Sequence, residues 1–112
     1  RFVAKATAAN AEIKDLLKEH GNKKIGEVTL AQVYQGMRGI TGLVTETSLL
    51  DSHEGIRFRG YSIPELQEKL PKSAHGTEPL PEGLFYLMLL GELPTKEDVD
   101  HVSAVLQRRS HV

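Results

Sequence analysis

The chain has 112 residues, of which 39% are apolar and 26% charged, an ordinary balance for one globular domain or part of a larger one. Its 14 basic and 15 acidic residues nearly cancel, so charge gives no reason to bind nucleic acid or an anionic membrane. Cysteine is absent, which excludes disulfides and thiolate chemistry. The longest apolar run, 84–90, is far shorter than the ~20 residues of a membrane-spanning helix.

The first part of the chain predicts one amphipathic helix. Residues 1–9 are small, basic and free of acids, and we expect them to be a flexible N-terminal segment. From Asn10 the apolar residues recur at helical spacing, and Gly21 ends the pattern. These apolar residues are Ile13, Leu16 and Leu17.

A capping pattern and a glycine-rich bend come next. Thr29 and Gln32 have the spacing of a capping box, in which each side chain satisfies a helix-end donor. A short helix is expected to follow. Three glycines at positions 36, 39 and 42 then predict a bend, because glycine adopts positive φ at little cost.

The middle of the chain predicts a β-hairpin. Residues 43–50 are rich in Thr, Val and Leu, and residues 56–59 alternate apolar with basic side chains. A turn-like segment, 51–55, separates them. A lone hairpin is marginal in water, so we expect it to pack on helices.

The remaining part of the chain, from Ser62 onward, predicts three helices. One begins at the Ser62–Glu65 capping box and ends at Pro71, before an exposed loop over 72–81. The second, 82–90, has almost no polar face and needs a cover that little of this chain can supply. The third begins at the capping pair Thr95 and Asp98 and has one apolar side. The class expected is mainly α with one small hairpin.

Few residues suggest chemistry. The five histidines, at positions 20, 53, 75, 101 and 111, match no metal-ligand spacing, and surface or capping roles are expected for them. The glycine bend matches neither the dinucleotide fingerprint nor the P-loop, although Arg38 within it is a natural phosphate partner. Arg57 and Arg59 should share one face of a strand, as an anion-binding ridge or as partners of Glu46 or Glu54. No catalytic residue and no metal site is predicted.

Several segments, in order and at matching spacing, closely resemble the citrate synthases of eukaryotic mitochondria. They are Gly36–Gly39, Gly42–Val44, Glu46–Asp51, Glu54–Gly60, Ser62–Glu65 and Glu78–Phe85, with Gly91 and Pro94–Thr95 behind them. The likeness runs from about Ile13 to about Val105, and the turn at Ser52–His53 departs from it. On this likeness, residues 10–112 are the incomplete N-terminal portion of the family's large helical domain.

The resemblance implies an acyltransferase of the tricarboxylic acid cycle. It condenses oxaloacetate with acetyl-CoA, as a homodimer in the mitochondrial matrix, with no metal and no cofactor because acetyl-CoA is a substrate. The family's catalytic histidines and aspartate and its oxaloacetate arginines match nothing in this chain, so the 112 residues alone are expected to be inactive. Arg38 matches the arginine of the family's Met-Arg-Gly motif and is the one candidate for binding CoA phosphates, in its own or a partner subunit's site.

Two other interpretations stay open. A methylcitrate synthase has the same architecture and takes propionyl-CoA. A non-catalytic module derived from citrate synthase would bind a full-length synthase or another helical partner instead.

Overall fold

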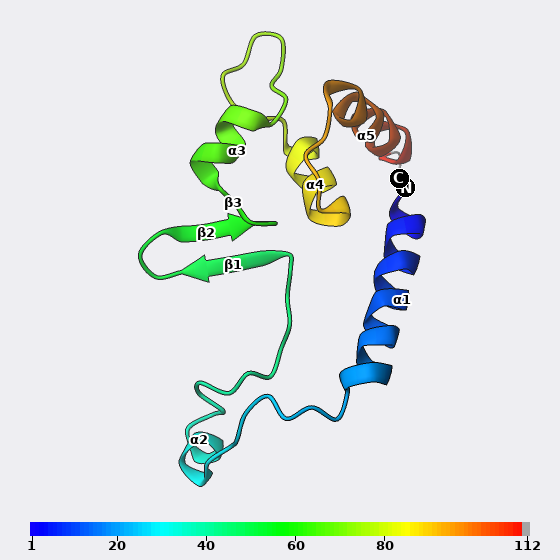
Figure 1. The fold of residues 1–112 in the computed structure, drawn as a ribbon. Helices are drawn as coiled ribbons and strands as arrows, with labels where there is room; N and C mark the ends of the chain where they lie inside the picture. The colour runs from blue at the N-terminus through cyan, green and yellow to red at the C-terminus, as the bar shows by residue number, and fades with distance from the viewer. Residues whose placement is uncertain (111–112) are drawn as a thin grey trace. The chain divides into compact units, whose positions relative to one another are not determined.

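The computed structural model describes residues 1–110. The chain divides into two compact units, Arg1–Val44 and Thr45–Val112. About half of the described residues are helical, and one small antiparallel sheet accompanies them (Figure 1). The prediction of a mainly α structure is confirmed.

The first unit contains helices α1 (Phe2–His20) and α2 (Leu30–Tyr34). Helix α1 ends before Gly21, as predicted, but it begins at Phe2 and not at Asn10. The segment 1–9, expected to be flexible, is therefore helical from Phe2 onward, because its four alanines are strong helix formers. No residue of this unit is buried.

Helix α2 begins with the predicted capping box. The Thr29 backbone N–H donates to Gln32 Oε1 at 2.9 Å, and the Gln32 N–H donates to Thr29 Oγ1 at 3.2 Å. These two bonds satisfy N–H groups that a helix start otherwise leaves free. The cap is local, which explains why the spacing alone predicted it.

The second unit opens with a three-stranded antiparallel sheet in the order β1 (Ser48–Asp51), β2 (Gly55–Phe58) and β3 (Tyr61–Ser62). The predicted hairpin is β1–β2, with Leu49 opposite Arg57. Strand β3 was not predicted. It forms because Arg59 and Gly60 both adopt positive φ, 50° and 87°, as the two central residues of a tight type I′ hairpin turn do.

Strand β1 lies at the edge of this sheet. It pairs only with β2, and all four of its residues are exposed. Leu49 and Leu50 expose 64% and 76% of their surface. The sheet therefore has one open, apolar edge within the described structure.

Helices α3 (Ile63–Lys69), α4 (Pro81–Leu90) and α5 (Lys96–Arg109) complete the unit. Capping boxes begin α3 and α5 as predicted. Helix α4 starts at Pro81 and ends at Gly91, which adopts the left-handed conformation with φ 73°. Figure 1 shows α4 between α3 and α5.

The core of this unit is small. Leu66 of α3 and Leu70, which directly follows that helix, pack with Leu87 of α4 in one cluster. Val99 of α5 is also fully buried. Helix α4, expected to be apolar nearly all round, buries one side and leaves Phe85 49% exposed on another. Across residues 1–110, none of the helices has the length and hydropathy needed to cross a membrane.

Candidate functional site

Arg38 lies in a glycine bend whose backbone is largely left-handed. Gly36, Met37 and Gly39 have φ of 72°, 61° and 77°. The Arg38 side chain is exposed, and within residues 1–110 it makes no hydrogen bond or ion pair. The guanidinium is therefore available to a ligand, and planar guanidinium groups bind phosphates through paired hydrogen bonds.

The bend also forms one wall of a hollow. Residues 39–41 and the connection 25–28 enclose about 220 Å³. Gly39, which follows Arg38 directly, is one of the lining residues. Sequence patterns could not show this hollow, because it depends on a tertiary contact between two loops. It places a concave surface beside the candidate phosphate-binding arginine.

Arg57 is an ion-pair residue. Its Nη2 lies 3.0 Å from Glu54 Oε2, and its Nη1 lies 3.7 Å from Glu65 Oε2. Nη1 also donates to the Gly60 carbonyl at 3.0 Å. Pairing with Glu54 was the predicted alternative to anion binding, and it is confirmed.

The predicted ridge with Arg59 is wrong. Arg59 follows strand β2 with φ 50°, so its side chain does not continue the strand's alternation. Its Nη2 and Nε donate to the Met88 carbonyl at 2.6 Å and 3.0 Å. Met88 lies in the last turn of α4, where free carbonyls and the helix dipole favour a cation. Arg59 thus caps a helix and ties the sheet to α4.

The hairpin turn at 51–55 holds one close Ser–His contact. Ser52 Oγ and His53 Nδ1 are 2.9 Å apart. Asp51 Oδ1 accepts hydrogen bonds from the backbone N–H groups of Glu54, at 2.9 Å, and His53, at 2.8 Å. These two bonds, that of Glu54 first, lower the pKa of Asp51. Because residues 51–54 of this turn are exposed, it is a stable turn and not a protected nucleophile–base pair.

The other histidines among residues 1–110 lie on the surface, as predicted. His20 is exposed, with Nε2 3.7 Å from Glu19 Oε2. His75 and His101 are exposed as well, and His111 lies outside the described residues. Within residues 1–110, no three histidine or carboxylate side chains are grouped to hold a metal ion.

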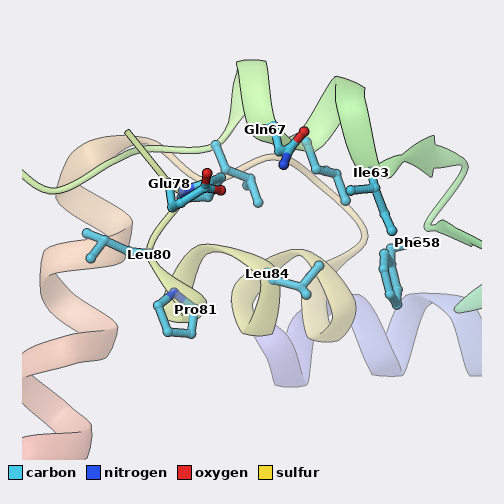
Figure 2. Close-up of a pocket in the computed structure, with 10 residues that line it drawn as sticks. Phe58, Ile63, Gln67, Glu78, Leu80, Pro81 and Leu84 are labelled. Carbon is cyan, nitrogen blue, oxygen red and sulfur yellow. The ribbon is translucent and has the colours of Figure 1, made fainter. Parts of the chain in front are cut away.

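A pocket of about 240 Å³ lies among α3, the loop before α4 and the start of α4 (Figure 2). Ile63 and Gln67 come from α3, and Leu84 comes from α4. Only Gln67 and Glu78 among its lining residues are polar. The remaining lining residues are Phe58, Leu66, Leu70, Pro79, Leu80 and Pro81. This pocket suits an apolar group, and its lining supplies no nucleophile.

Fold and site together define part of a mainly α-helical protein with an exposed arginine beside a hollow. A family model described as citrate synthase, C-terminal domain, matches residues 36–112. The chain belongs to the citrate synthase family.

Relatives in the family are close. The mitochondrial citrate synthase of Aspergillus niger is 58% identical over 109 residues, 97% of this chain and 23% of the relative. That of Saccharomyces cerevisiae is 56% identical over 112 residues, 100% of this chain and 23% of the relative. A probable mitochondrial citrate synthase of Glossina morsitans morsitans is 57% identical over 102 residues, 91% of this chain and 22% of the relative. The chain thus spans less than a quarter of the length of these relatives.

Proposed function

We propose that the chain is the N-terminal portion of a mitochondrial citrate synthase. The complete protein would act in the mitochondrial matrix as a homodimer and condense oxaloacetate with acetyl-CoA to citrate and CoA. The observation that carries this proposal is the 55–58% identity to relatives named as mitochondrial citrate synthases. No feature of the chain favours the methylcitrate synthase or the non-catalytic module.

In this proposal the described residues supply binding and not chemistry. The proton transfers of the condensation belong to residues outside this chain, and acetyl-CoA is a substrate, so no cofactor is needed. Arg38 holds a phosphate of CoA, in its own or a partner subunit's site. Its exposure, its lack of a partner within residues 1–110 and the hollow beside it support this role.

A contact to a remote phosphate acts in a recognisable way. It holds the substrate equally well before and during the reaction, so its loss raises KM more than it lowers kcat. A hydrogen-bonded charge pair of this kind is worth about 1.5–3 kcal/mol, or roughly a 10- to 150-fold change in affinity. Oxaloacetate carries none of these phosphates, so its KM should not change.

The experiment uses the complete protein and two matched variants. We expect Arg38→Gln to raise the KM for acetyl-CoA roughly 10-fold or more, with the KM for oxaloacetate unchanged. Arg109→Gln, which removes an exposed arginine from α5, is the control and should match the parent enzyme. Equal kinetics for the two variants would refute the role of Arg38, and a complete protein that forms no citrate would refute the proposed function.

A further inference from the structure

Gln32 of α2 lies against the glycine bend and is held there by hydrogen bonds from two directions. Its side-chain Oε1 accepts from the Thr29 backbone N–H at 2.9 Å and from Thr29 Oγ1 at 3.3 Å. Its backbone carbonyl accepts from the Met37 N–H at 2.7 Å. Of residues 1–44, only Gln32 and Ile40 are partly shielded from solvent. Gln32 is therefore the residue that joins α2 to the bend.

The bend forms a tight turn around Arg38. The Ile40 N–H donates to the Met37 carbonyl at 3.2 Å, which closes a turn over residues 37–40. Arg38 is the second residue of this turn, and Gly39, with φ 77°, is the third. Positive φ at the third position is typical of a type II turn and favours glycine there. The turn thus fixes the backbone from which the Arg38 side chain projects.

The amide nitrogen of Gln32 lies beside the same turn. A Cβ placed on Gly39 would be 3.8 Å from Gln32 Nε2. The Thr29 backbone N–H can only donate, so the amide atom that faces it must be the oxygen, and Nε2 takes the other position. Among residues 1–110, Nε2 has no hydrogen-bond acceptor. A fixed donor with no acceptor therefore stands next to the residue that follows Arg38.

We propose that Gln32 Nε2 and the Arg38 guanidinium bind the same phosphate of CoA, so that Gln32 is a second binding residue of this site. The inference rests on the proposed function. A phosphate has several acceptor oxygens, and a guanidinium that binds it through two bonds leaves others for a neighbouring amide. Because the capping box already orders the Gln32 side chain, binding costs little further side-chain entropy.

The alternative is that Gln32 only caps α2, and replacement by glutamate separates the two roles. Thr-x-x-Glu is a capping box as well, whereas a carboxylate has no N–H to donate and repels a phosphate. In the complete protein we expect Gln32→Glu to keep the parent Tm. It should raise the KM for acetyl-CoA roughly 10-fold or more, by a larger factor than it lowers kcat, and leave the KM for oxaloacetate unchanged.

Gln35→Glu is the matched control for the added charge. Gln35 is exposed and is nearer to Arg38 in sequence than Gln32 is. Repulsion from a nearby carboxylate would act in both variants, whereas the loss of a phosphate donor occurs only in Gln32→Glu. We expect Gln35→Glu to leave the KM for acetyl-CoA near the parent value.

A double-mutant cycle tests whether the two side chains share one phosphate. Gln32→Met removes the donor without adding a charge. Its effect on the KM for acetyl-CoA should be severalfold in the parent and much smaller in Arg38→Gln, because residues that share a partner have non-additive effects.

Three results would overturn the inference: a parent-like KM for acetyl-CoA in Gln32→Glu, an equal rise in Gln35→Glu, and additive effects in the double-mutant cycle. If Arg38→Gln alone still raises that KM, the proposed function stands without this inference. Calorimetry measures CoA binding to the same variants independently of turnover. A complete protein that forms no citrate, yet loses CoA affinity in Gln32→Glu and not in Gln35→Glu, would support the shared phosphate and reject the proposed function.

Discussion

At the scale of single residues, Arg59 joins two parts of the second unit. Its backbone lies in the left-handed region, which side chains other than glycine adopt at a cost of roughly 1–2 kcal/mol. Its guanidinium offsets that cost by donating twice to the Met88 carbonyl at the end of α4. Both properties can be separated by mutation, because alanine removes only the guanidinium whereas glycine also relieves the backbone.

We expect Arg59→Ala to lower the free energy of unfolding by about 1.5–3 kcal/mol, the usual loss for a hydrogen bond to a charged group. Arg59→Gly should lower it by roughly 1 kcal/mol less, since glycine accepts positive φ. Urea-induced unfolding of the complete protein measures both. If glycine is as damaging as alanine or more so, backbone strain at this position is not significant.

Glu65 predicts a dependence of stability on pH. The backbone N–H of Ser62 and then its hydroxyl donate to this carboxylate and lower its pKa below the ordinary 4.5. A group whose pKa is lowered by folding adds stability above its unfolded pKa and loses that stability as pH falls through its folded pKa. Glu65→Gln keeps the acceptor oxygen but cannot titrate. The difference in Tm between parent and Glu65→Gln should therefore shrink from pH 7 to pH 3, and a constant difference would contradict this.

At the scale of elements, the starts of the helices that have capping boxes were the most predictable feature. The capping pairs that begin α2, α3 and α5 are local in sequence, so their spacing predicted three helix starts that the structure confirms. Strand β3 and the Arg59 contact were missed because the Arg59–Gly60 turn lacks the common asparagine or aspartate signal. The glycine-rich setting of Arg38 pointed to this residue as a possible site, whereas the hollow beside it needs a tertiary contact between two loops.

The end of α4 gives a sharp test of glycine's role. A Cβ at Gly91 would lie 3.7 Å from Arg59 Cζ, an ordinary contact, so space does not forbid alanine there. Its φ of 73° does. We expect Gly91→Ala to cost roughly 1 kcal/mol of unfolding free energy.

The control is Gly42→Ala, where φ is not positive and no atom lies within 4 Å of a Cβ. It should be neutral or slightly stabilising, because alanine restricts the unfolded chain. Thermal unfolding of both variants in the complete protein provides the comparison, and equal losses would show that left-handed geometry at Gly91 is unimportant.

At the scale of the whole molecule, the described residues bury little. The first unit has no buried residue, and the buried hydrophobic residues of the second are Leu66, Leu70, Tyr86, Leu87 and Val99. Apolar burial is the main favourable term in folding, while each ordered residue costs roughly 1–2 kcal/mol of backbone entropy. A core of this size does not offset the ordering of 110 described residues.

We therefore expect the 112-residue polypeptide, produced alone, to bind a dye that reports exposed apolar surface and to lack a cooperative thermal transition. Amide hydrogens of α1 should exchange within the shortest time measured, because α1 has no buried residue. A single sharp melt of the monomer without dye binding would contradict this expectation.

The open edge of β1 has a consequence for handling such a polypeptide. Strand β1 carries two neighbouring leucines and a row of unpaired backbone groups. It contains no lysine, proline or bulge that would block the addition of another strand. Copies of the chain that lack a cover can pair edge to edge through this strand into dimers, so dilution and speed of purification should matter more than salt. Light scattering that rises with concentration, and falls when Leu50 is replaced by lysine, is the expected sign.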